Sequence, residues 1–414
     1  MSELIEQATK KTGELVSNCH VLAIQDTTEL NYQAHADRVS GLGPVGNGKD
    51  AGLFLHPLLV LEAESGACLG VGDIHTWIRD NPEPTKDSVE FAKKTSRDYQ
   101  KLPIEEKESY RWLEVALKGK KTLAEAKLVT VVADRESDIY EEWYRIPDEK
   151  THLLTRASHN RRLGNEHLLF NYVANLDVQG IQQLKVRERE EKRSAHVAEL
   201  EIRFGEVEIM RSIGCTDKNA PEKIKLTVVD VKELPESVIA EEKPIHWCLL
   251  TTHKVETIED AQQIVRWYCQ RWQIEQLFRT LKKQGYQVES SQLETGENLT
   301  KLAIIAVRAA VQTMQLTLAR NNKAVDLPVN TVFSEEQVEV LKAIQPRLEG
   351  KTEKQKNMHL LGKLSWAAWI IARLGGWKGY ASERQAGPIT MLRGQKEFAS
   401  LCRGWLLAKD VCIP

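Results

Sequence analysis

Four polar side chains within residues 268–282 follow a spacing that suits chemistry on a phosphate ester. They are Tyr268, Arg271, Glu275 and Lys282. On one α-helix, at roughly 100° per residue, they fall within an arc of about 60°. A carboxylate can bind a metal ion, and flanking cations can bind the oxygens of a phosphodiester beside it. The alternative is a solvent-exposed helix with an Arg271–Glu275 ion pair and an exposed lysine. We expect the shared face to be functional.

Two aspartates stand where such a metal site could be completed. Asp26 follows the apolar run Val21–Ile24, and Asp134 follows the run 128–133, and both runs are typical of buried strands. Metal ions that act on a phosphodiester need carboxylates that converge from separate elements. Taken alone, each aspartate would more often be a turn or helix-cap residue. Together with Glu275, they predict a site for Mg²⁺, which prefers oxygen ligands.

The first part of the chain predicts strands with two helices among them. Two apolar segments within 54–78 are joined by the turn residues Ser65 and Gly66, which indicates an antiparallel hairpin. A charged region from about 84 to 120 permits a helix, and a second helix follows the strand that ends at the later aspartate. Residues 152–158 form one more strand. The predicted order is β-β-β-α-β-α-β, with an aspartate at the C-terminal end of two strands.

The second part of the chain changes in character. Residues from about 160 to 245 alternate between apolar and polar side chains, which predicts a β-rich insertion. Within it, the mixed-charge run 185–193 is expected to be a solvated face. The helix that carries 268–282 should begin near Thr257, and 298–320 should form a long helix with a wide apolar face. The remainder is predicted to be helical, with tryptophans packed in its core.

Bulk composition sets the class of protein. The chain has 414 residues, of which 42% are hydrophobic and 28% charged, as expected for a globular protein with more than one domain. Its net charge of −2 excludes a uniformly basic nucleic-acid binder but allows a local basic patch. Seven cysteines include no CxxC pair, which argues against a disulfide framework or a zinc site. With no apolar leader and no window of about 20 apolar residues, we expect a cytoplasmic protein.

The spacing Tyr-x2-Arg-x3-Glu-x6-Lys resembles the signature of the insertion-sequence-four family of bacterial cut-and-paste transposases. These are DDE transposases with an RNase H-like, retroviral-integrase-like core. Further segments are similar to that family in the expected order: QDTT around Asp26, ADRESDIY around Asp134, and ARLGGW followed by GPITMLRG near the C-terminus. The likeness covers nearly the whole chain.

The resemblance implies roles for the residues that match the motifs. Asp26, Asp134 and Glu275 would be the catalytic triad that binds the metal, Mg²⁺, with Mn²⁺ able to substitute. Three further side chains would hold phosphates of the transposon end near the cleavage site: Tyr268, Arg271 and Lys282. The partner implied is double-stranded DNA, as transposon end and as target, bound by a homodimer at the nucleoid. A homodimer is expected because synapsis of two ends needs two active sites.

Two more residues match family positions that contact DNA. Arg156 would contact the DNA directly, and its alternative is an ordinary arginine at a strand edge. Trp247 would lie near a base flipped out of the DNA end, where an aromatic surface replaces lost stacking. A core tryptophan is the alternative for Trp247. Asp138 is expected to serve the start of a helix and His253 to lie in a loop, neither as a metal ligand.

We therefore expect an α/β fold with an RNase H-like core, a β-rich insertion and a helical C-terminal dimerisation region. The predicted domains are core residues 1–158, insertion 159–245, returning core 246–295 with the Glu-bearing helix, and dimerisation region 296–414. The activity implied is metal-dependent cleavage of transposon ends, through hydrolysis and a hairpin, followed by strand transfer.

One departure from the family concerns the N-terminus. Full members carry a helical domain that recognises the transposon end before the first catalytic aspartate, whereas here that aspartate is residue 26. An alternative function is therefore a truncated transposase that dimerises with a full-length one and inhibits it. A weaker alternative is a structure-specific nuclease without transfer activity.

Overall fold

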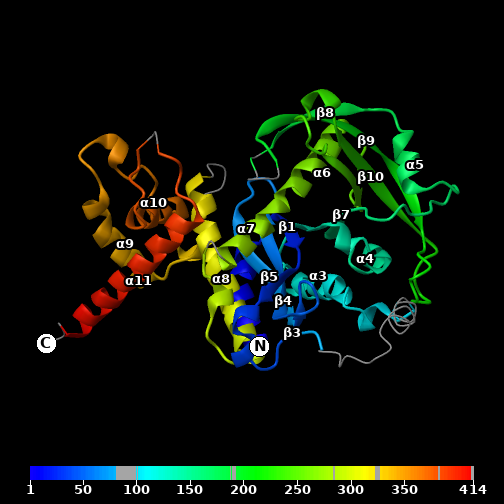
Figure 1. Cartoon of the computed structure of the whole chain (residues 1–414). Helices are drawn as coiled ribbons and strands as arrows, with labels where there is room; N and C mark the ends of the chain where they lie inside the picture. Colours follow the sequence, from blue (N-terminus) through cyan, green and yellow to red (C-terminus); the bar gives the residue numbers. More distant parts are fainter. Residues whose placement is uncertain are drawn as a thin grey trace. The chain divides into compact units, whose positions relative to one another are not determined.

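A computed structural model of the chain describes residues 1–80, 99, 101–186, 188, 193–282, 285–321, 327–380 and 383–411 (Figure 1). The chain divides into two compact units. We call the unit of His20–Asp26 and Pro82–Trp272 the sheet unit, and the unit of Met1–Cys19, Thr27–Asn81 and Gln273–Pro414 the hairpin unit. These units group the chain differently from the predicted domains, whose boundaries stay predictions. Residues 84–98 and 100 of the charged region predicted from about 84 to 120, and residues 187 and 189–192 of the mixed-charge run, lie outside the described residues.

The sheet unit is built on parallel strands. β6 (Leu128–Ala133) pairs in parallel with β1 (His20–Gln25) on one side and β7 (Thr151–Arg156) on the other. These strands are mostly buried apolar runs, as expected for parallel strands covered on both faces. Short helices connect them: α3 (Tyr110–Thr122), η3 (Arg135–Ser137) and α4 (Tyr140–Arg145). The mixed α/β class and the predicted strands before the two aspartates are confirmed.

The region 159–245 is β-rich, as predicted, and its strands continue the same sheet. β11 (His246–Thr251) is antiparallel to β7, and β10 (Lys223–Glu233), β9 (His196–Met210) and β8 (Gly180–Val186) follow in antiparallel order. Helix α5 (Leu169–Ala174) precedes them. Helix α6 (Ile258–Gln270) contacts β6, β9 and β10, so it covers this part of the sheet (Figure 1).

The predicted single helix over 268–282 is wrong. Helix α6 starts at a capping box on Thr257, as expected, but ends at Gln270, and α7 (Trp272–Leu281) follows. At the junction, Arg271 keeps helical dihedrals, φ −50° and ψ −33°, while its N–H bonds the carbonyl of Tyr268 three residues earlier. This tighter turn interrupts the α-helical bonding. Lys282 lies beyond the last residue of α7.

The hairpin unit contains the predicted hairpin. β4 (Asp50–Glu62) and β5 (Cys68–Trp77) are antiparallel, and two short strands that the sequence did not predict, β2 (Thr28–Asn31) and β3 (Gly43–Val45), pair with β4. Helix α1 (Ser2–Leu15) packs on β5. The close packing of α1 on β5 depends on Gly70. This residue has φ +143°, and a Cβ added to it would lie 2.0 Å from Thr12 Oγ1.

The rest of the hairpin unit is helical, as predicted. The long helix α8 packs against β5, α10 and α11, and α10 is buried along almost its whole length. The helices are α8 (Gly296–Asn321), α9 (Glu335–Leu348), α10 (Leu364–Leu374) and α11 (Pro388–Val411). The short 3-10 helices of this unit are η1 (Gln33–Arg38), η5 (Val288–Ser290), η6 (Val329–Thr331) and η7 (Glu353–Gln355). Those of the sheet unit are η2 (Ile104–Glu106) and η4 (Pro235–Ser237).

Helix α8 corrects the expectation that the chain has no window of about 20 apolar residues. Within the described residues, its segment Gly296–Arg320 is long and apolar enough to cross a membrane by length and composition. In the structure, 61% of that apolar window is buried within the protein. The burial and its packing against β5, α10 and α11 explain the apolar composition as that of a core helix.

Candidate active site

Asp26 and Asp134 stand at the C-terminal ends of two neighbouring parallel strands. The pairing of β1 with β6 places Ile24 opposite Val132, and each aspartate comes two residues later. Because the ends of parallel neighbours meet at one edge of a sheet, the two carboxylates are brought to the same place. Both are half-buried, with 25% and 29% of the side chain exposed. The expected convergence of these two residues is confirmed.

One arginine lies between the two carboxylates. Arg271 Nη1 is 3.3 Å from Asp26 Oδ2, and its Nη2 is 3.8 Å from Asp134 Oδ2. A guanidinium can serve two acceptors at once because its donors form a planar fork. These two ion pairs hold the guanidinium at the ends of β1 and β6. The positive charge offsets the repulsion that two adjacent carboxylates would otherwise experience.

Tyr268 supports the same pair from α6. Its hydroxyl donates to Asp134 Oδ1 at 3.1 Å, and the side chain is buried. Burial, together with the charge of Asp134, raises the pKa of the Tyr268 phenol well above its usual range, although Arg271 and Arg156 oppose the shift. Tyr268 is therefore a neutral hydrogen-bond donor that holds the orientation of the aspartate.

Trp247 and Arg156 come from adjacent strands, β11 and β7. The Trp247 ring meets the Tyr268 ring edge-on, with centroids 5.3 Å apart. The Trp247 side chain is half-buried. Arg156 ends β7 and donates from Nη2 to the carbonyl of His246 at 2.9 Å. Both residues thus belong to the surroundings of Tyr268.

Asp138 has a different role from the expected helix start. It is buried, and its carboxylate accepts hydrogen bonds from the backbone N–H groups of Ser158 and His159, at 2.8 and 3.0 Å. Arg161 pairs with the same carboxylate at 2.6 Å. The side chain therefore ties the loop after β6, which carries Asp134, to the loop after β7. Sequence reasoning missed this network because its members are about 20 residues apart.

A second buried acid, Glu142, lies in α4 and bonds a residue of the loop after β6. Ser137 donates to Glu142 Oε2 at 2.5 Å, and Glu142 Oε1 has no hydrogen-bond partner among the described residues. Burial raises the pKa of Glu142 well above its usual range, with smaller contributions from Asp138 and Glu141. Burial therefore favours the protonated carboxyl group, which lowers the cost of burying an unpaired charge.

His253 lies in the loop after β11, as expected, and its ring is part of a cluster of aromatic side chains. Its ring stacks on His152, with centroids 4.0 Å apart, and lies 5.0 Å from Trp267 of α6. The Thr130 hydroxyl lies 2.8 Å from both His253 Nε2 and His20 Nε2. Burial and the neighbouring histidines lower the pKa of His253 to about 3, so the ring is neutral. The cluster links α6 to β1, β6 and β7.

Glu275 and Lys282 belong to the hairpin unit. Glu275 stands in the first turn of α7, whose buried apolar side chains are Ile274, Leu277 and Leu281. Lys282 Nζ is 3.8 Å from Glu289 Oε1. The roles of Glu275 as third metal ligand and of Lys282 as phosphate contact stay predictions.

The donor set at the strand ends fits a hard divalent cation. Asp26 and Asp134 offer carboxylate oxygens, the ligands that Mg²⁺ and Mn²⁺ prefer, and the Arg271 guanidinium shows that this edge concentrates negative charge. Across the described residues, no group of three or more histidine, cysteine, aspartate or glutamate side chains is close enough together to hold a metal ion. The complete triad therefore stays a prediction.

Part of the chain matches one known protein family. Residues 115–311 match the family described as "Transposase DDE domain", which supports a DDE transposase family for this chain. The matched stretch contains Asp134, Tyr268 and Arg271. Among solved structures, the chain is similar to a piggyBac transposase in a synaptic complex with hairpin DNA, with a TM-score of 0.39 and 9% identity. That similarity covers 94% of this chain and 54% of the other, so the chain spans about half the length of that transposase.

Proposed function

We propose that this protein is a DNA transposase of the DDE group, with an RNase H-like core that cleaves transposon ends and joins them to target DNA. The observation that carries the proposal is the pair Asp26 and Asp134 at adjacent strand ends, bridged by Arg271. The match of residues 115–311 to the transposase DDE domain supports the same class of enzyme.

The proposed metal ligands are Asp26, Asp134 and Glu275. A bound Mg²⁺ would activate the attacking oxygen and stabilise the leaving oxygen of the phosphodiester. The first two carboxylates come from a rigid sheet, so their orientation is set before DNA binds. Glu275 follows Arg271 by four residues, so chain connectivity keeps it within about 14 Å of that residue.

The proposed reaction consists of successive displacements at phosphorus. Water attacks the phosphodiester at the transposon end, the bond to the 3′ oxygen breaks, and a 3′-hydroxyl is released. That hydroxyl attacks the opposite strand to form a hairpin, and the flanking DNA leaves. A second water opens the hairpin, and the restored 3′-hydroxyl then attacks target DNA. Each step forms one P–O bond and breaks one.

Five side chains are proposed to position the DNA. Arg271 and Lys282 would bind phosphate oxygens as charged donors, and Arg156 would contact the backbone near β7. Trp247 would stack near an extruded base, which its half-buried ring allows. Tyr268 would act mainly through Asp134, because its hydroxyl already bonds that carboxylate.

We also propose a homodimer formed through the C-terminal helices. Near its C-terminal end, α11 exposes a group of large apolar side chains: Leu401, Trp405, Leu406 and Leu407. Apolar groups of this kind on a helix end are typical of protein–protein contacts. Removal of this surface by Leu406→Glu and Leu407→Glu should shift the protein to monomers in analytical ultracentrifugation. A control substitution, Lys396→Glu, changes charge on the same helix without removing apolar surface.

The test of the proposed function uses the full chain and a supercoiled plasmid carrying the DNA that flanks its gene. We expect Mg²⁺-dependent nicking and hairpin formation by the wild type, and their loss in Asp26→Asn and Asp134→Asn. Asp177→Asn, at an exposed position of the sheet unit, is the matched control. Cleavage retained by both active-site variants would contradict the proposal.

A further assay distinguishes an active transposase from the alternative, a truncated transposase that inhibits a full-length one. The wild-type chain and Asp26→Asn are each mixed with a full-length relative that transposes in vitro. Equal inhibition by both, together with no cleavage by the chain alone, would assign it as a dimerising inhibitor instead.

A further inference from the structure

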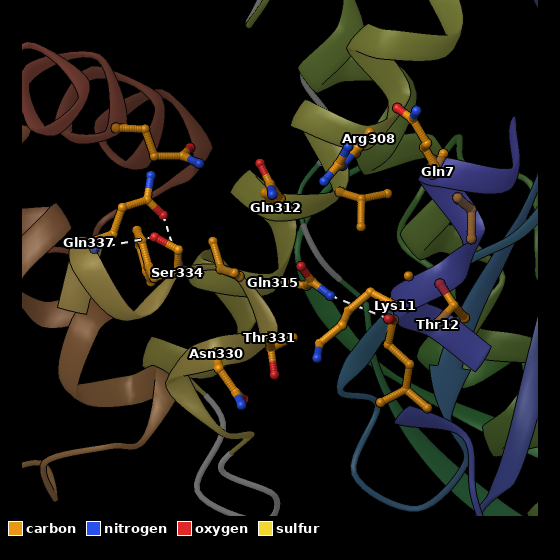
Figure 2. A pocket seen from close by; sticks show the side chains of 18 of the residues that line it. Gln7, Lys11, Thr12, Arg308, Gln312, Gln315, Asn330, Thr331, Ser334 and Gln337 are labelled. Carbon is orange, nitrogen blue, oxygen red and sulfur yellow. Dashed lines mark hydrogen bonds between the residues drawn. The ribbon is translucent and has the colours of Figure 1, made fainter. Parts of the chain in front are cut away.

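A polar cavity of about 600 Å³ lies within the hairpin unit (Figure 2). Its walls come from α1, β5, α8, residues 330–334, α9 and α11. Side-chain amides line it from several of these elements. We call it the amide cavity, after Gln7, Gln312, Gln315, Asn330, Gln337 and Gln395.

The charge of the amide cavity is one-sided. Lys11 and Arg308 line it, whereas no aspartate or glutamate is among the described residues that do. This is notable in a chain with 59 acidic residues. Lys11 pairs with Glu14 at 2.7 Å, outside the lining. Arg308 is exposed and forms no ion pair with any residue that the structure describes. The cavity therefore favours an anionic ligand.

The amides retain both donor and acceptor capacity. Gln395 Oε1 accepts a hydrogen bond from Thr313 at 2.6 Å, which leaves its NH₂ group to donate. Gln315 Nε2 donates to the carbonyl of Leu69 at 3.4 Å, which leaves Oε1 to accept. Thr331, only 7% exposed, has an Oγ1 atom with no partner among the described residues. A buried hydroxyl of this kind is expected to meet a polar ligand or water.

We propose that the amide cavity binds a nucleotide unit, with its phosphate on Arg308 and Lys11 and its base edge on the amides. Arginine and lysine are the usual phosphate donors. Glutamine and asparagine amides match the adjacent donor and acceptor of a base, above all adenine. The cavity is within the size of small-ligand sites, about 300–1,000 Å³. A free mononucleotide and a nucleotide of a DNA strand offer the same chemistry.

The test measures binding of 5′-dAMP, inorganic phosphate, and single- and double-stranded 12-nucleotide DNA to the full chain by isothermal titration calorimetry. Arg308→Gln should weaken binding of the true ligand about tenfold, the loss of one charge-assisted contact. Lys301→Gln is the matched control, because Lys301 lies on the same helix, pairs with Glu297 and does not line the cavity.

A second variant fills the cavity with a large side chain, and a neighbouring variant is its control. Ala399 is exposed and lines the amide cavity, so Ala399→Phe should occlude it without disturbing the core. Its neighbour Ser400 is exposed and outside the lining, so Ser400→Phe is the control. Thermal unfolding of each variant confirms that the fold is intact.

Each outcome decides the proposal. Loss of dAMP binding in both cavity variants, with both controls normal, identifies a free nucleotide as the ligand. Loss restricted to DNA binding identifies a strand. Equal binding by cavity and control variants, or no binding of dAMP and DNA by the wild type, overturns the proposal. The variants keep Asp26 and Asp134, so the plasmid cleavage assay tests the proposed function independently.

Discussion

Arg271 Nη1 lies 3.3 Å from Asp26 Oδ2, although the two residues are 245 positions apart in the chain. The pair joins the end of β1 to the end of α6, and the second nitrogen of the same guanidinium faces Asp134. The arginine therefore offsets part of the negative charge of the two proposed metal ligands and orients them.

The first prediction concerns this guanidinium. Arg271→Ala should lower the rate of DNA cleavage by about 10²-fold or more, as expected when a positioned charged donor is removed from an active site. Arg271→Lys should lose less, because it keeps the charge without the planar fork. Single-turnover cleavage measures both effects. Arg266→Ala, an exposed arginine on α6, is the control, and an equal loss in that variant would assign the effect to general charge.

The second prediction isolates the Tyr268 hydroxyl. Tyr268→Phe keeps the ring against Trp247 but removes the hydrogen bond to Asp134. The free energy of unfolding should fall by about 1.5–3 kcal/mol, the usual value for a bond to a charged acceptor. Urea titration measures the change. Tyr172→Phe is the control, since that hydroxyl donates weakly, at 3.4 Å, to the carbonyl of Glu206; a similar loss there would contradict the assignment.

The third prediction is a loss of stability in acid through His253. Its pKa is lowered from 6.5 to about 3, so folding favours the neutral ring. The stabilisation is complete above pH 6.5 and declines as the pH falls towards 3, by at most about 1.4 kcal/mol per pH unit. The pKa of His152 is lowered in the same direction. Urea titrations at pH 7.5, 6, 5 and 4 should show a shallower decline for His253→Gln than for the wild type. An unchanged slope would show that other groups dominate.

The fourth prediction concerns the contact of α1 with β5. Gly70→Ala should lower the unfolding temperature strongly, because the new Cβ would lie 2.0 Å from Thr12 Oγ1 and because φ is +143°. Gly48→Ala is the control, since Gly48 has φ +78° but nothing within 4 Å; it measures backbone strain alone, about 1–3 kcal/mol. Differential scanning calorimetry compares the two. An equal effect at both positions would contradict the role of the close contact.

Local sequence patterns predicted much of the fold. The apolar runs before Asp26 and Asp134 were sufficient to identify β1 and β6, because buried parallel strands are continuously apolar. The turn at Ser65 and Gly66 predicted the β4–β5 hairpin in the same way. Two short edge strands, β2 and β3, carry too few residues for a recognisable alternation.

Non-local interactions account for what the sequence did not predict. No glycine or proline marks the break at Arg271, so the continuous spacing of residues 268–282 indicated one helix. Asp138 finds its partners in the loop after β7, and His253 finds its partners on β6, β7 and α6. Nothing in the immediate sequence of either residue identifies those partners. The aspartates at the strand ends of the site could be predicted from the sequence. The pairing of Arg271 with Asp26 could not, because it depends on how α6 packs on the sheet.

The continuation of the core sheet through β11 has an evolutionary consequence. β11 pairs with β7 on one edge and with β10 on the other, from Thr227–Thr251 to Lys232–His246. A gene that lost residues 159–245 would leave a long row of unpaired backbone groups beside Trp247, a surface prone to aggregation. A segment that replaced it would therefore have to supply a strand that pairs with β11 in the place of β10.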